Sequence, residues 1–441
     1  MKRKVGVALA ATATLIALAL AIAPWLVGQR IEKTLTQTLD SPAGPFEQRL
    51  VDYRRGWFSA EARSELLFES DSGPLVLRFD HQVRHGPWRF GWAQVESRAQ
   101  SDPQGPTGHY FGDRAPLSAT TEVAFNGDIE SRFDAPAFDE TALYGGDEGQ
   151  VTWGGMTGSY RQSEARAALA LALPALSLQR AGDRLILENA RLAANGPAGE
   201  TFAEAQTRLS LGRFEMVDDD RDTRLEAGIE SQSRLFEQGE GVLALSASLR
   251  ADNVLFEAPD RAIEITGTTQ TLALRGLPRE PTLRLLSALA DTDPILDEAQ
   301  TVAHTRALLT RYLMDIAAGS PSIEYTLADF TTPRGSMSGR LEAGLEASAE
   351  GEGTPASLLA RALLALELDA DRTLLTRLSA LETGASAGLI EALMQENLLI
   401  ADGDRLRTSI EARDQSLVVN GEPRPELFML LLMSLSLSLS L

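Results

Sequence analysis

The stretch that decides the fold is Arg208-Leu209-Ser210-Leu211-Gly212-Arg213-Phe214, in which apolar and polar residues alternate. This period of two is typical of a β-strand with one buried face. Segments of the same kind lie on both sides of it, at 168–178, 184–192, 223–231, 241–249 and 262–274. Turn residues separate them, namely Ala181-Gly182-Asp183, Asn195-Gly196 and Gln238-Gly239-Glu240-Gly241. Many short strands joined by such turns predict an antiparallel, meandering sheet rather than alternating strands and helices.

Helical patterns interrupt the strands after residue 280. Asp293-Pro294 has the form of a helix start, and we expect a helical insertion over about 280–318. Strand-like segments follow at 322–327, 338–347 and 363–369, then two short helices at 372–381 and 387–399, then a closing hairpin at 405–411 and 416–419. The predicted fold class is α+β, mainly β: an elongated antiparallel meandering sheet with a helical insertion, preceded by one N-terminal transmembrane helix.

The N-terminus carries the signal for that transmembrane helix. Lys2-Arg3-Lys4 precede an uncharged run from Val5 to Val27. These 23 residues would span about 34 Å as a helix, enough to cross a hydrocarbon core of about 30 Å. A cleaved signal peptide is the competing interpretation, but its apolar stretch is usually shorter. Because basic residues stay on the cytoplasmic side, the sequence predicts a bacterial inner-membrane protein with its main domain in the periplasm.

Composition excludes several function classes. The chain has a formal net charge of −21, which disfavours binding to nucleic acid through charge. It contains no cysteine, so disulfides, thiolate metal sites and cysteine nucleophiles are excluded. A Gly-x-Ser-x-Gly string stands at 384–388, but no histidine follows His304 to complete a serine hydrolase of that class. No motif in the chain calls for a cofactor.

Composition also divides the chain into five parts. They are a cytoplasmic basic tip at 1–4, a transmembrane signal-anchor helix at 5–27, an aromatic-rich periplasmic region at 45–160, a β-rich periplasmic region at 161–426 and an apolar Ser-Leu tail at 427–441.

Two motifs after the predicted anchor resemble a known family. Tyr53-Arg54-Arg55-Gly56-Trp57-Phe58-Ser59 comes first, His85-Gly86-Pro87 follows, and Asn420-Gly421 stands before a short apolar segment near the end. In order and spacing this resembles the YdgA-like bacterial envelope family, also described as domain of unknown function 945 (DUF945). The resemblance implies a periplasmic location and no established catalytic activity. It singles out as tentative binding residues Tyr53, Arg55, Gly56, Phe58, Ser59, His85, Gly86 and Pro87.

Each of these residues has a functional and an architectural interpretation. An exposed Arg55 beside Trp57 and Phe58 can hold a glycan or a lipid head group. In the architectural interpretation, which we favour, Gly56 permits a bend and the aromatic rings pack. His81 and His85 have a spacing that binds zinc on a helix, but the residues around them predict a strand. Positions four apart on a strand lie about 13 Å from each other, too far to share an ion. We therefore predict no metal site.

Two function classes remain open. The first is a non-enzymatic envelope protein that binds or scaffolds a lipid, a glycan, another protein or a second copy of itself, with residues 5–27 in the inner membrane. The second is a hydrolase of an envelope glycan that uses Asp80 or Asp113 as its acid or base. Such a hydrolase needs two carboxyl groups about 5–10 Å apart in a cleft.

Overall fold

The computed structural model describes residues 46–427, except for 69–74, 89–90, 144–145, 147, 199–203, 220–221, 260, 291–306, 309–311, 313–314, 317–319, 347–360, 384–387 and 414–415. Within this part of the chain no helix is long and apolar enough to cross a membrane. The predicted anchor at 5–27 and the tail beyond Leu427 lie outside the described residues.

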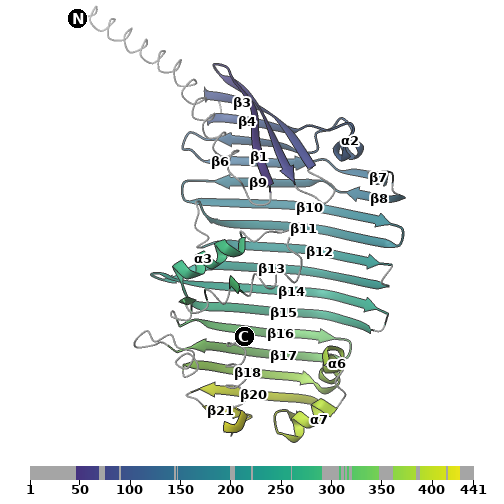
Figure 1. The fold of residues 1–441 in the computed structure, drawn as a ribbon, viewed down its shortest axis with the longest axis vertical. Helices are drawn as coiled ribbons and strands as arrows, with labels where there is room; N and C mark the ends of the chain where they lie inside the picture. The colour runs from purple at the N-terminus through teal and green to yellow at the C-terminus, as the bar shows by residue number, and fades with distance from the viewer. Residues whose placement is uncertain are drawn as a thin grey trace, which may run out of the picture. The chain divides into compact units, whose positions relative to one another are not determined.

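The chain divides into two compact units. Unit 1 runs to Ala181 and includes Glu188–Gly199, and unit 2 comprises Gly182–Leu187 and Glu200–Leu441. Strands dominate both units (Figure 1). The prediction of a mainly β protein with antiparallel, meandering strands is therefore confirmed.

Unit 1 is an antiparallel sheet in which neighbours along the chain mostly pair. Its elements are β1 (Phe46–Arg55), β2 (Ser59–Phe68), β3 (Leu75–Trp88), β4 (Gly91–Ala99), α2 (Pro106–Phe111), β5 (Ser118–Val123), β6 (Ile129–Ala135), β7 (Phe138–Ala142), β8 (Glu148–Trp153), β9 (Met156–Gln162) and β10 (Arg166–Arg180). Strands β1 to β6 pair in chain order, and β6 then pairs with β9. Strand β10 pairs with β9 along its first part and with β8 along its second. Pro174 falls at this change of partner, where a strand can lack an N–H donor.

Strand β11 (Asp183–Pro197) contributes residues to both units. The predicted turn at Asn195-Gly196 is wrong, because both residues lie inside this strand. The predicted turn at Ala181-Gly182 is confirmed, with Ala181 at a positive φ of 52°.

Unit 2 is a longer antiparallel meander. Its strands are β12 (Gln206–Asp218), β13 (Thr223–Gly239), β14 (Val242–Ala258), β15 (Arg261–Pro278), β16 (Ser322–Thr332), β17 (Gly335–Leu345), β18 (Ala362–Asp371), β19 (Ile400–Asp402), β20 (Arg405–Arg413), β21 (Ser416–Val419) and β22 (Glu422–Pro423). From β12 to β18 each strand pairs with the next, and β18 then pairs with β20.

Helices also join the strands of unit 2. Those with described bounds are α3 (Arg279–Ala290), α6 (Arg372–Thr383) and α7 (Gly388–Gln395). Helices α6 and α7 confirm the two short helices expected before the closing hairpin. The predicted helix start at Asp293-Pro294 lies outside the described residues. Figure 1 shows α3 beside the strand ends on one side of this sheet, and α6 and α7 beside the strand ends on the other side.

Among the described residues of unit 2, the buried side chains form small clusters near the helices and in the closing hairpin. Leu235, Leu243 and Leu277 form one cluster, against which Leu283 and Leu286 of α3 pack. Ile390, Leu399 and Leu406 form another below α6 and α7. A third surrounds Ala412, Leu417 and Val419 in the closing hairpin. The hydrophobic contacts that fix the sheet are therefore concentrated near the ends of the strands.

Candidate functional site

The two sequence motifs meet at one end of the unit 1 sheet. The turn between β1 and β2 consists of Gly56, Trp57 and Phe58, and the Gly56 amide donates a 2.7 Å hydrogen bond to the Ser59 carbonyl. The His85 amide, on β3, donates a 3.0 Å hydrogen bond to the Phe58 carbonyl. The sequence identified both motifs, but only the pairing of β2 with β3 brings them together.

Three of the motif residues are set into the sheet. His85 is almost fully buried, with 1% of its surface exposed. Tyr53 is half-buried, and its hydroxyl group is buried. Gly86 has a φ of +131°, a conformation that residues with a Cβ rarely adopt. It lies where the pairing of β3 with β4 shifts register, between His85 and Trp88. Pro87 continues β3 through the same irregularity.

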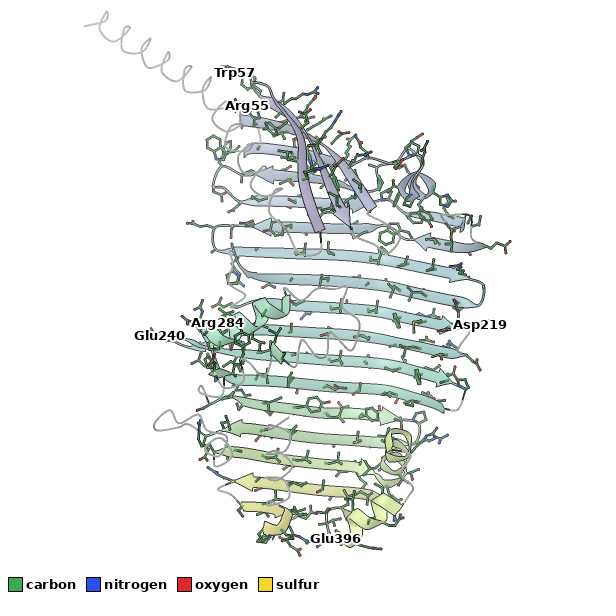
Figure 2. The ribbon with its side chains drawn as sticks, in the orientation of Figure 1. Arg55, Trp57, Asp219, Glu240, Arg284 and Glu396 are labelled. Carbon is green, nitrogen blue, oxygen red and sulfur yellow. The ribbon has the colours of Figure 1, made fainter. Side chains whose placement is uncertain are left out.

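The motif residues in and beside the β1–β2 turn face solvent. Trp57 is 53% exposed and Phe58 is 46% exposed, and Arg55 and Ser59 are also exposed. Figure 2 shows Arg55 and Trp57 at the end of the β1–β2 hairpin. The motif therefore combines a buried part that fixes the turn with an exposed part that carries two aromatic rings and a guanidinium group.

A second candidate site is the apolar face of unit 2. The strand register places Ala247, Leu272, Tyr325, Leu341, Leu366 and Ile410 in one row across six strands. Each residue in this row is half-buried, and none is buried. The row therefore lies on a face that no second sheet within the described chain covers in the way that a β-sandwich core is covered. We call this row the apolar row.

The opposite face of the same strands is polar. The residues next in sequence to those of the apolar row also pair across the six strands. They are Ser248, Thr271, Thr326, Arg340, Glu367 and Ser409. Ion pairs cross this face: Arg340 contacts Glu324 at 2.9 Å, and Arg407 contacts Asp369 at 2.7 Å. Sequence alternation predicts that each strand has two faces, but the continuous apolar row was missed because it depends on register.

A hollow of about 300 Å³ lies where β14, β15 and β16 approach α6. Its apolar lining includes Ile263 and Phe330 from the sheet and Leu374 and Leu378 from α6. Both signs of charge also line it. They come from Arg334, Arg377, Glu257 and Glu264. A volume of this size lies at the small end of the range for ligand pockets.

Comparison with protein families identifies the chain. A model described as "Bacterial protein of unknown function (DUF945)" matches residues 1–426. The chain belongs to the DUF945 family. The membership that the motifs suggested is therefore confirmed. Neither the comparison with curated proteins nor the comparison with solved structures gave a match.

The first two histidines of this DUF945 protein lie on β3, as the sequence predicted for that segment. His81 is held between two neighbouring strands, because its ring nitrogens lie 2.8 Å from the hydroxyl groups of Ser64 and Ser97. Burial lowers the pKa of His81, and the nearby Asp80 opposes this shift. Among the described residues of the chain, no group of three or more His, Asp and Glu side chains is placed to hold a metal ion.

The two carboxylates considered for catalysis line one hollow of about 640 Å³ in unit 1 of the DUF945 protein. Asp80 already has two partners: Arg63 Nε lies 3.2 Å from its Oδ1, and Gln100 Nε2 lies 2.5 Å from its Oδ2. Asp113 lies on the same lining, and Trp57 and Trp92 do not. Because both oxygens of Asp80 accept bonds that join β3 to its surroundings, the geometry favours a structural role for this residue.

Proposed function

We propose that this DUF945 protein is a non-enzymatic, membrane-anchored periplasmic protein that binds lipid acyl chains on the apolar face of unit 2. The apolar row is the observation that carries the proposal. Its side chains are mostly aliphatic and half-buried, and they continue across six paired strands. A flexible hydrocarbon chain can lie along such a row without needing directional contacts.

The energetics favour an occupant on this face. Covering a partly exposed aliphatic side chain contributes up to about 1 kcal/mol, so an acyl chain that crosses several strands gains a few kcal/mol. Soluble proteins rarely leave long apolar stretches open to water, and those that do usually use them to bind. The polar face on the other side of the same strands gives no comparable gain.

The hollow beside α6 supports a zwitterionic phospholipid as the ligand class. Its apolar lining includes Phe330, which pairs with Met337 of β17. Met337 lies four residues before Leu341 of the apolar row, so both side chains lie on the same face of β17 and the lining continues onto the apolar face. Arg334 and Arg377 can contact a phosphate group, and Glu257 and Glu264 can contact an ammonium group. A head group with one charge of each sign matches this lining better than an anion alone.

The test is mass spectrometry of the full chain, extracted from membranes with a mild detergent and then exchanged into a lipid-free amphipol. We expect about one phospholipid per chain to remain bound, enriched in zwitterionic species over the bulk membrane. Retention of no lipid, or of a lipid mixture identical in composition to the bulk membrane, would refute specific lipid binding.

A carboxylate-dependent glycan hydrolase is the second candidate, because Asp80 and Asp113 line the same hollow. It predicts release of soluble sugar from purified cell-wall material by the native chain and none by an Asp113→Asn variant. If neither chain releases sugar, the hydrolase is rejected and the binding function stands alone.

A further inference from the structure

We propose that one end of the unit 1 sheet inserts into the surface of a lipid bilayer. The contacting residues are Trp57, Phe58, Trp92 and Phe125, which we call the aromatic edge. This proposal concerns unit 1 and does not depend on lipid binding by unit 2.

Strand pairing places the aromatic edge at a single end of the sheet. Ser59 at the start of β2 pairs with Arg84 near the end of β3, and His85 pairs with Ala93 near the start of β4. Ala93 in turn pairs with Val123 at the end of β5. The β1–β2 turn, the start of β4 and the β5–β6 turn therefore lie at the same end. These segments contain all four aromatic residues.

Three of the four residues of the aromatic edge are exposed to solvent, and Trp92 is half-buried. Trp57 is 53% exposed, Phe58 46% and Phe125 55%. Trp92 packs edge-on against Phe125, with 5.5 Å between ring centroids, and its Nε1 donates a 2.9 Å hydrogen bond to the Phe125 carbonyl. These contacts hold Phe125 outward. The bonds from Gly56 and His85 to the β1–β2 turn likewise fix the backbone that carries Trp57 and Phe58.

A bilayer is the partner that this chemistry fits. Tryptophan favours the membrane–water interface, where its ring is apolar and its N–H stays hydrated. Arg54 and Arg55 are both exposed beside this turn, and Arg54 is ion-paired with Asp52 at 3.0 Å. The guanidinium group of Arg55, next to Trp57, suits the phosphate of an anionic phospholipid, which contributes about 1 kcal/mol for a basic residue near the surface.

The absence of cysteine from the chain makes a clean experiment possible. A Ser59→Cys variant places one environment-sensitive fluorophore beside the intact aromatic turn, and Asp113→Cys places the same probe before β5, at the other end of the sheet. Both full-length proteins are reconstituted into vesicles of phosphatidylethanolamine and phosphatidylglycerol, with and without nitroxide-labelled lipid. We expect blue-shifted emission and strong quenching by nitroxide lipid at position 59, and neither effect at position 113.

Adding Trp57→Ser and Phe58→Ser to the Ser59→Cys variant should abolish the quenching while the circular dichroism spectrum stays unchanged. Equal quenching at positions 59 and 113, or none at position 59, would overturn the proposal. A blue shift at position 59 without quenching by nitroxide lipid would show burial against protein, a second copy included, and would also overturn it.

Discussion

The backbone amide of His85 donates a 3.0 Å hydrogen bond to the carbonyl of Phe58. This bond joins the two sequence motifs, although its acceptor lies in a turn and its donor inside a strand. Its donor belongs to a residue that is 1% exposed, and its acceptor to a residue whose side chain is 46% exposed. The two motifs thus form one structural unit, in which the buried His85 holds the backbone of the exposed aromatic turn in place.

The conformation of Gly86 is expected to limit what can replace it. Its φ of +131° lies in a region that L-residues occupy at a cost of about 1–3 kcal/mol. Gly86→Ala should lower the free energy of unfolding of unit 1 by about that amount, measured by urea denaturation. Gln82→Ala, at an exposed position of the same strand, should change it by less than about 0.5 kcal/mol. Equal effects of the two substitutions would contradict the structural role of Gly86.

The half-buried His81 predicts a pH-dependent stability of unit 1. Burial lowers its pKa from the ordinary value of 6.5, so the unfolded chain binds a proton that the folded chain does not. Stability is therefore fully present above about pH 6.5 and decreases as the pH falls from there toward the folded pKa. Denaturation between pH 7.5 and 5 should show this loss. His81→Gln should weaken it.

Glu215 is expected to stabilise unit 2 through a buried carboxylate. Its side chain is fully buried and contacts Arg184 and Arg213, with Arg224 at 3.9 Å, while these arginines stay about 40% exposed. Removing one partner of a fully buried ion pair costs about 3–5 kcal/mol. Because the arginines here are partly exposed, Glu215→Gln should lower the free energy of unfolding by somewhat less than that.

Glu226 provides the matched control for this prediction. It contacts Arg213 and Arg224 but is 30% exposed, so Glu226→Gln should cost less than about 1 kcal/mol. If thermal denaturation gave both variants the same loss, burial of Glu215 would not be the source of its contribution.

The two faces of β15 are expected to differ in their effect on lipid binding. Leu272→Asn places an amide in the apolar row, and it should weaken phospholipid binding by several-fold to about tenfold in a fluorescent-lipid displacement assay. Thr271→Asn makes a similar change one residue away on the exposed polar face, and the dissociation constant should stay the same. A dissociation constant unaffected by Leu272→Asn would remove the apolar row from the binding site.

Much of the fold could be predicted from local sequence. Alternation over 207–214 and its neighbours predicted strands that the structure confirms as β10 to β15, each extended by several residues. The turn at Asn195-Gly196 is the clear error. Both residues lie within β11, where Arg166 Nη2 lies 3.4 Å from the Asn195 side-chain oxygen. A local turn signal was overridden there by pairing with a neighbouring strand.

The candidate sites were harder to predict from the sequence than the fold was. It identified the residues of both motifs, but it treated them as separate and favoured an architectural role for the whole first motif. The structure divides that motif: Tyr53 is set into the sheet, whereas Trp57 and Phe58 point outward. Asp80 and Asp113 were named separately, and only the fold places them on one hollow.

The sequence by itself determined the family, the strand-rich class and the two-faced character of each strand, because those properties depend on motifs and on a period of two along the chain. Tertiary structure decided which residues become neighbours. A shift of one residue in the pairing of β14 with β15 would place Leu272 beside Ser248 instead of Ala247, and the apolar row would no longer exist. Strand register, and the bulges that shift it, depend on contacts between segments that are far apart in the sequence. Local sequence patterns therefore cannot predict them.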